Sequence, residues 1–231
     1  MLSKKIFPLP SSLISLISSL FLFLFCAYGQ DDARSQKIID DMTAKFKTYP
    51  SVSLSFSAVT THWQDQPETE QAGKLWLKNN KYKLELSDFV IFFDGSKIYQ
   101  YLPEVKEVNV TKPDLDEDDE NFQLLNPQSY FNLSSKSFKS NLVKENTMNN
   151  RRVYEIDLYP INIKTTNFSR IRVMIEKSTL QLVYLMAIMT DGTQYALSFK
   201  PYEILPTALR DSFFSFNKSE HPGVEMIDLT F

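Results

Sequence analysis

The residue types that carry most enzyme chemistry are scarce in this chain and do not cluster. The 231 residues include two histidines, His62 and His221, and one cysteine, Cys26. A zinc site needs several such ligands at short spacing, and a catalytic triad needs a base near its nucleophile. We therefore expect neither a bound metal nor a nucleophilic catalytic site.

Two other kinds of catalytic site are also disfavoured. The chain has five glycines, and no stretch matches the G-x-G-x-x-G or P-loop patterns that cradle phosphates. The carboxylate pairs Asp88 with Asp94 and Asp116 with Glu117 could in principle transfer protons, but their surroundings indicate turns and a solvated loop. We expect no cofactor and no catalytic residue, and an enzyme acting on a lipid or glycan stays open as an alternative.

The overall charge argues against nucleic acid as a partner. Lys and Arg number 25 against 28 Asp and Glu, a formal net charge of −3, whereas a nucleic-acid-binding domain is basic on one face. Aromatic residues reach 13%, which favours an aromatic-rich binding or structural fold. The acidic block Asp114–Glu120 is typical of a solvated loop, and a docking patch for a basic partner is the alternative.

The first 29 residues have the three parts of a secretory signal peptide. The start is basic, Leu13–Phe25 is an uncharged and mainly apolar run, and small residues precede the junction after Gly29. The apolar run is short for a membrane span, although an uncleaved anchor stays open. Lipidation of Cys26 is disfavoured because a phenylalanine precedes it. We expect cleavage after Gly29, one domain over residues 30–231, and a periplasmic protein without disulfides.

The periodicity of apolar residues indicates the elements that follow. Residues 31–49 have apolar residues at helical spacing and end before Pro50, which predicts one helix with a single apolar face. From Val52 onward, apolar and polar residues alternate in short segments joined by tight turns such as Asp94-Gly95, a pattern typical of antiparallel strands. A short helix or irregular cover is expected within 126–133. We predict one mainly β domain of the α+β class, with about eleven antiparallel strands and an N-terminal helix.

Two segments, Phe89–Phe93 and Leu180–Met189, are apolar at nearly every position instead of alternating. A strand of that kind is expected to be covered on both faces. One helix cannot fill the concave side of a curled sheet of eleven strands. The sequence therefore predicts either a thick side-chain core or a cavity that holds an apolar ligand.

Several motifs, taken in order, resemble those of the LolA family of periplasmic lipoprotein carriers. They are Gly73–Lys78 (GKLWLK), Tyr82–Glu85 (YKLE), Asp94–Pro103 (DGSKIYQYLP), and a C-terminal Phe214-Ser215-Phe216 followed by Pro222-Gly223-Val224 and Asp228. The resemblance covers nearly the whole chain after the leader. It implies an unclosed half-barrel of eleven antiparallel strands, with the N-terminal helix and short helices forming a lid over an aromatic-lined cavity.

The resemblance also implies a function and partners. A LolA-like chain would bind the acyl chains of lipoproteins released by an inner-membrane ABC transporter and pass them to an outer-membrane acceptor. We expect a monomer without a cofactor. A LolA-fold lipid-binding sensor or acceptor protein of the cell envelope is the alternative.

The candidate site residues follow from the alternation along the strands and from the apolar face of the helix. The residues expected to line the acyl cavity are Leu54, Phe56, Leu75, Leu77, Tyr82, Leu84, Ile91 and Phe93. The residues expected to form the lid are Ile38, Ile39, Met42 and Phe46 of the helix, together with Asn79. Family members often carry an arginine at the place of Asn79, thought to hydrogen-bond the lid shut. An asparagine could form a weaker, uncharged hydrogen bond there.

Overall fold

The computed structural model describes residues 32–62, 68–113, 126–133, 137–164 and 166–230. A helix spans 32–46, somewhat shorter than the expected 31–49, and a turn follows it to Pro50. The strands are β1 (Ser51–Thr61), β2 (Thr69–Lys78), β3 (Lys81–Glu85), β4 (Val90–Phe93), β5 (Ile98–Leu102), β6 (Glu107–Thr111), β7 (Phe138–Met148), β8 (Arg151–Pro160), β9 (Phe168–Glu176), β10 (Leu182–Met189), β11 (Gln194–Phe199), β12 (Glu203–Leu205) and β13 (Glu225–Asp228). Three short 3-10 helices are η1 (Pro127–Phe131), η2 (Asp211–Phe214) and η3 (Lys218–Glu220). The leader and the acidic block Asp114–Glu120 lie outside the described residues.

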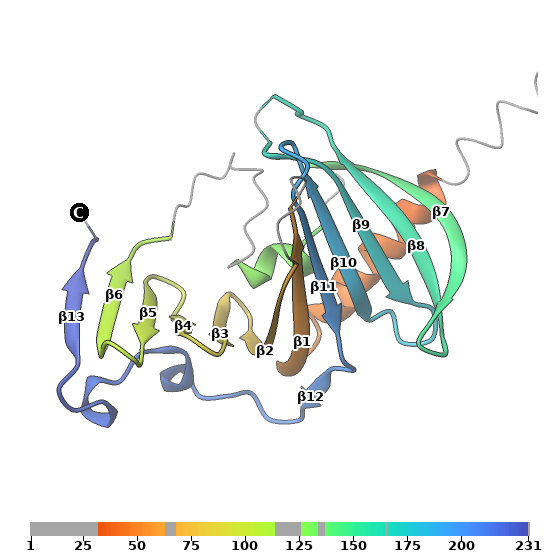
Figure 1. The fold of residues 1–231 in the computed structure, drawn as a ribbon. Helices are drawn as coiled ribbons and strands as arrows, with labels where there is room; N and C mark the ends of the chain where they lie inside the picture. The colour runs from red at the N-terminus through yellow and green to blue at the C-terminus, as the bar shows by residue number, and fades with distance from the viewer. Residues whose placement is uncertain (1–31, 63–67, 114–125, 134–136, 165, 231) are drawn as a thin grey trace, which may run out of the picture.

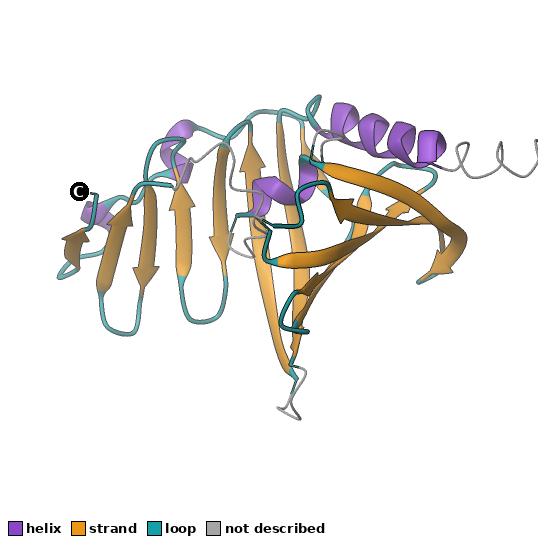
Figure 2. Ribbon diagram, turned by 90° about the horizontal axis from the view of Figure 1, so that it is seen from above, coloured by secondary structure: helices purple, strands orange, loops and turns teal. Residues whose placement is uncertain are grey.

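All the strands belong to one sheet that does not close into a barrel (Figure 1). Its order is β13-β6-β5-β4-β3-β2-β1-β11-β10-β9-β8-β7, with β12 paired to β1 off this path. Two meanders, β1–β6 and β7–β11, are therefore joined by the antiparallel pairing of β1 with β11. Seen from above, the sheet bends, and η1 lies inside the bend (Figure 2). The predicted fold class, an unclosed and mainly antiparallel sheet with an N-terminal helix, is confirmed.

Two short strands add to the expected eleven. β12 pairs with the start of β1, and β13 pairs with β6 in parallel, so the expectation of a wholly antiparallel sheet is wrong at that edge. Parallel neighbours need a crossover connection. β6 and β13 are separated along the chain by residues 112–224, which include the whole second meander. The last part of that connection, 206–224, carries η2 and η3 back along β2–β6 (Figure 1).

Alternation along the strands assigns their side chains to two faces. On the inner face, strand pairing aligns Leu54, Leu75, Leu84 and Ile91 in one row across β1–β4, and all four are at most 3% exposed. These residues join one core cluster with apolar residues of β8–β11, of the N-terminal helix and of η1. The main core therefore lies between the bent sheet and these two cover elements.

The C-terminal segment covers the opposite, outer face of β2–β6. Trp76 of β2 contacts Phe213 with ring centroids 5.6 Å apart, and Phe92 of β4 contacts Phe216 at 6.0 Å. A second small core forms there around Val108, Val110 and Val224. The apolar run Phe89–Phe93 is thus covered on both faces, as expected.

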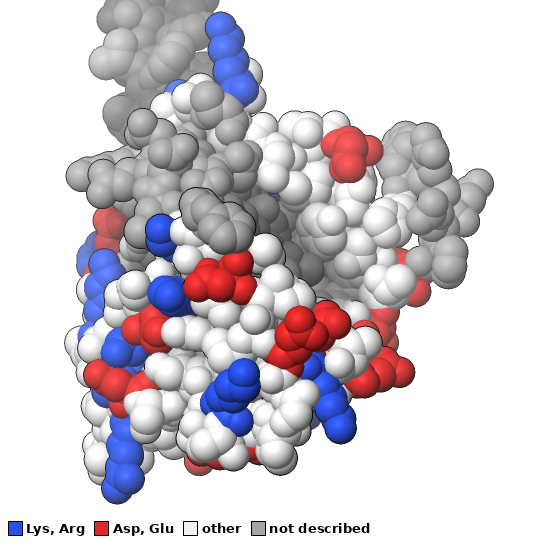
Figure 3. All heavy atoms as spheres, turned by 90° about the vertical axis from the view of Figure 1, so that its left-hand side faces the viewer, with Lys and Arg blue, Asp and Glu red and all other residues white. Residues whose placement is uncertain are grey.

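The other apolar run, Leu180–Met189, does not fully follow the expectation. On β10, Leu182, Leu185 and Ala187 are completely buried in the main core, whereas Tyr184, Met186 and Ile188 on the outer face are partly exposed. Charged side chains of both signs are interspersed over the end of the molecule at β13 (Figure 3).

Candidate functional site

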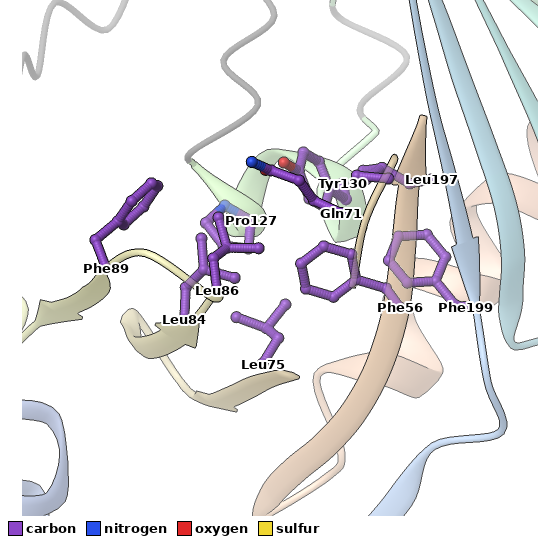
Figure 4. A pocket seen from close by; sticks show the side chains of 11 residues that line it. Phe56, Gln71, Leu75, Leu84, Leu86, Phe89, Pro127, Tyr130, Leu197 and Phe199 are labelled. Atoms are coloured by element: carbon purple, nitrogen blue, oxygen red, sulfur yellow. The ribbon is translucent and has the colours of Figure 1, made fainter. Parts of the chain in front are cut away.

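An apolar cavity of about 60 Å³ lies under η1 on the inner face of the sheet (Figure 4). Its lining comes from both meanders and from η1, and consists of Phe56, Ala58, Gln71, Leu75, Leu84, Leu86, Phe89, Pro127, Tyr130, Leu197 and Phe199. Gln71 is the one polar aliphatic residue among them, and Tyr130 brings the one hydroxyl. Such a lining favours the binding of hydrocarbon and offers few directional contacts.

Gly73 shapes this cavity by allowing the ring of Phe56 to lie across β2. The two residues face each other in the β1–β2 register, and a Cβ at residue 73 would stand 2.4 Å from the Phe56 ring and 2.9 Å from Leu86. Any larger residue would have to displace that ring. The glycine of the GKLWLK motif therefore has a packing role beside the cavity.

Two tyrosines sit in this apolar environment. Burial raises the pKa of Tyr82 to about 12, and burial also raises the pKa of Tyr130, the hydroxyl that borders the cavity. Both side chains are nearly inaccessible, at 3% and 4% exposure. Tyr130, the phenol in the cavity wall, is therefore uncharged near neutral pH, and so is Tyr82 in the core nearby.

The raised pKa of Tyr82 predicts a loss of stability in alkali. In the unfolded chain the phenol releases its proton near pH 10, while in the fold it keeps the proton until about pH 12. The contribution of Tyr82 to the free energy of unfolding is therefore fully present below pH 10. It falls as the pH rises from 10 toward 12. Each unit of that window costs about 1.4 kcal/mol at this one site.

Urea unfolding at pH 8 and at pH 11 measures that loss. The variant Tyr82→Phe should lose less of its free energy of unfolding between the two pH values than the parent chain does. An equal loss in both proteins would contradict the assignment to Tyr82.

The structure places all eight predicted cavity residues on the inner face but brings only some to the cavity. Phe56, Leu75 and Leu84 line it, whereas Leu77 borders a second cavity on the other side of η1. The remaining four are packed in the main core and line neither cavity: Leu54, Tyr82, Ile91 and Phe93. Their role in ligand binding stays a prediction.

Sequence reasoning missed the residues contributed by the second meander and by η1. Leu197 and Phe199 come from β11, which meets β1 only through long-range pairing. Pro127 and Tyr130 come from η1, where the sequence indicates a cover but not which side chains point inward. The alternation of β11 marks Leu197 and Phe199 as candidates for a buried face, but only the pairing places them beside Phe56.

The predicted lid residues lie where the helix meets the sheet and η1. Ile38, Ile39 and Met42 are buried in the main core, and Phe46 stacks on Phe131 of η1 with ring centroids 4.2 Å apart. At the other end of the helix, the Ser35 and Ser140 hydroxyls share a hydrogen bond of 2.8 Å, which ties the helix to β7. The helix thus bridges one edge of the sheet and η1.

Asn79 lies in the β2–β3 turn and has a positive φ of 50°. Asparagine tolerates this left-handed conformation better than most residues, which accounts for it there. Within the described part of the chain, its side chain makes no hydrogen bond to the helix, and its role as a lid contact stays a prediction. The neighbouring Lys78 instead donates to the carbonyl of Leu209 and to Asp211, on the outer face.

Two further observations concern the described residues alone. Their His, Cys, Asp and Glu side chains form no group of three or more that could hold a metal ion. None of the helices in these ranges combines the length and the hydrophobicity needed to cross a bilayer.

No protein-family model matches the sequence, and no curated protein sequence matches it. Solved structures do match. An uncharacterized conserved protein from Thermus thermophilus is 8% identical with a TM-score of 0.56, and the match covers 84% of this chain and 99% of that one. A LolA superfamily protein from Nitrosomonas europaea is 10% identical with a TM-score of 0.42, covering 79% and 97%. A lipoprotein from Mycobacterium tuberculosis is 12% identical with a TM-score of 0.46, covering 77% and 100%.

These likenesses concern the fold alone, because every identity is far below the range in which function is shared. The Thermus protein has the same overall fold as this chain over most of both sequences.

Proposed function

We propose that this chain is a lipid-binding carrier of the bacterial envelope that holds the acyl chains of lipoproteins under η1. The observation that carries the proposal is the cavity itself, which is lined almost wholly by apolar side chains of both meanders and roofed by η1. The motif resemblance supports the same function. On this proposal the partners are acylated lipoproteins, the inner-membrane transporter that releases them and an outer-membrane acceptor.

The energetics of acyl chains explain why such a carrier is needed. Each CH₂ moved from lipid into water costs about 0.8 kcal/mol, so one chain of about 16 carbons costs roughly 13 kcal/mol. A protein that covers the chain with apolar side chains removes most of that cost. Aromatic walls such as Phe56, Phe89 and Phe199 offer large surfaces without imposing strict directional contacts.

The cavity as it stands is too small for a whole acyl chain. Its volume of about 60 Å³ has room for about four water molecules. A bound chain must therefore part the cover from the sheet and occupy space that the cover fills in this closed form. The large apolar surface shared by η1, the helix and the inner face then becomes the binding surface.

Mass spectrometry of lipids extracted from the protein purified from its native envelope tests the proposal. Co-purifying acylated lipoprotein or lipid, in a stoichiometric amount, is the expected result. A lipid-free protein that also fails to bind a fluorescent acyl probe would contradict the carrier function. Stable retention at one membrane, with no transfer to acceptor vesicles, would favour the sensor or acceptor alternative instead.

The proposed location makes a prediction about the N-terminus. We expect export and cleavage after Gly29, because small residues occupy the positions before that junction. The intact mass of the exported protein should match a chain that begins at Gln30. A mass that shows an acylated Cys26 at the N-terminus would instead indicate an anchored protein.

A further inference from the structure

A second cavity, of about 640 Å³, lies on the other side of η1 from the apolar one. It is bordered by the end of the N-terminal helix, by the β2–β3 turn and by η1, with Val52 and Leu77 as its apolar contribution from the sheet. The rest of its lining is rich in side-chain amides: Asn79, Asn80, Asn126, Gln128 and Asn132. This concentration of amides contrasts with the hydrocarbon lining of the first cavity.

The two cavities share η1 as a dividing wall. Pro127 and Tyr130 of this short helix face the apolar cavity, whereas Gln128, Ser129 and Phe131 face the amide-rich one. The strands below continue from one to the other, since Leu75 lines the first and Leu77, two residues further on β2, lines the second. A ligand that lies under η1 can therefore place different parts of itself in the two cavities.

One amide that lines the second cavity has a donor without a hydrogen-bond partner among the described residues. The Nε2 atom of Gln128 is buried, and among the described residues it finds no acceptor. Buried polar groups are nearly always paired, because leaving one unpaired is costly. The atom is enclosed in this closed form, so we expect an acceptor oxygen of a ligand to reach it when η1 shifts to admit the acyl chain.

The lining of the second cavity holds more uncharged amides than charged groups, since two of its thirteen residues are lysines and five are amides. Of the two lysines in the lining, Lys78 already donates to Leu209 and pairs with Asp211 at 2.8 Å. Lys47 is the other, and it lies exposed beyond the end of the helix. The NH₂ groups of amide side chains donate hydrogen bonds, which matches ester and peptide carbonyl oxygens because these accept.

We propose that the amide-rich cavity binds the polar head of the acylated ligand, through carbonyl oxygens of its glyceryl esters or of its first peptide bonds. Gln128 donates to one of these carbonyls while the acyl chains lie under η1. This inference rests on the proposed function and adds to it the recognition of the head group, which a site for hydrocarbon alone would lack.

The variant Gln128→Leu tests the proposal, with Gln100→Leu as its matched control. Gln100 lies on β5, is partly buried and lines neither cavity. The probes are palmitate, dipalmitoylglycerol and a dipalmitoyl-S-glyceryl-cysteinyl hexapeptide. We expect Gln128→Leu to weaken binding of the hexapeptide about tenfold, the value of one hydrogen bond, with palmitate binding unchanged. Gln100→Leu should change neither.

The measurement with dipalmitoylglycerol identifies which part of the ligand provides the carbonyl. If dipalmitoylglycerol shows the same dependence on Gln128 as the hexapeptide, the glyceryl esters provide the acceptor. If only the hexapeptide shows it, the acceptor belongs to the peptide. Equal affinity of the hexapeptide for the Gln128→Leu and Gln100→Leu variants would overturn the inference, as would an equal loss for palmitate.

A short-chain head group separates this inference from the proposed function. The diacetyl analogue of the same hexapeptide has no long acyl chain, and its binding is read from the side-chain amide resonance of Gln128 by NMR. A shift of that resonance supports the head-group site even if palmitate fails to bind. Failure of palmitate to bind would contradict the carrier function alone. An unmoved resonance at saturating analogue overturns the head-group site.

Discussion

Replacing Ala58 with phenylalanine is expected to reduce binding of an acyl probe at least tenfold while the protein stays folded. Ala58 lines the apolar cavity and points toward it from β1, opposite Leu197 in the register with β11. The added ring would occupy the space of about 60 Å³ that now lies empty. Filling a void changes stability little, and overpacking would cost about 1–3 kcal/mol, so lost binding would not reflect unfolding.

The chain offers a matched control in Ala72→Phe. Ala72 is exposed and lies next to Gln71 on β2, so its side chain points to the outer face, away from the cavity. The two variants add the same ring to neighbouring strands of one sheet. Titration with a fluorescent fatty acid, together with urea unfolding of each variant, separates binding from stability. Parent-like binding by Ala58→Phe, or an equal loss in both variants, would contradict the placement of the acyl chain.

Local signals in the sequence determined much of this fold. The alternation in Leu75, Leu77 and Leu84 correctly assigns them to one buried face, because a side-chain period of two leaves no other choice for a half-buried strand. The hairpin at Asp94-Gly95 forms as expected. The Asp94 carboxylate accepts from the backbone of Ser96 and Lys97, and Gly95 adopts a φ of 96°.

The cavity itself could not be predicted in the same way. Leu54 and Leu75 pair directly across β1 and β2 and have the same pattern of burial, but only Leu75 borders the cavity. The difference depends on where η1 lies, and η1 is positioned by its contacts with the helix and with β11. Those contacts are long-range, such as Phe131 with Phe199 at 6.1 Å between ring centroids.

The parallel pairing of β13 with β6 could not be predicted for a related reason. The end of the sequence, with Phe213, Phe216 and Val224, has the composition of a strand or a core segment, and it covers the outer face of β2–β6 instead. The rings of Phe213 and Phe216 find partners only once β2 and β4 are side by side in the sheet. Burial of the outer face also explains why β4 needs apolar residues on both sides.

The movement that admits an acyl chain is expected to occur between the helix and η1. The two cover elements meet where Phe46 stacks on Phe131, at the amide-rich cavity, whereas the start of the helix is held to β7 by the Ser35–Ser140 hydrogen bond. A chain too long for the closed cavity can enter if the end of the helix parts from η1 while its start stays in place. Cross-linking that stack should therefore slow both uptake and release of an acyl probe.

The test uses the variant Phe46→Cys/Phe131→Cys with a short, reducible thiol cross-linker. The chain also carries Cys26→Ser, which removes its one native cysteine. The control Ser35→Cys/Ser140→Cys ties the same helix to β7 at its start. We expect the first cross-link to slow probe release at least tenfold, reduction to restore the parent rate, and the control tie to leave the rate unchanged. Equal slowing by both ties would mean that the whole helix lifts. Unchanged rates under both ties would show that neither contact opens during exchange, and that the ligand reaches the inner face by another path.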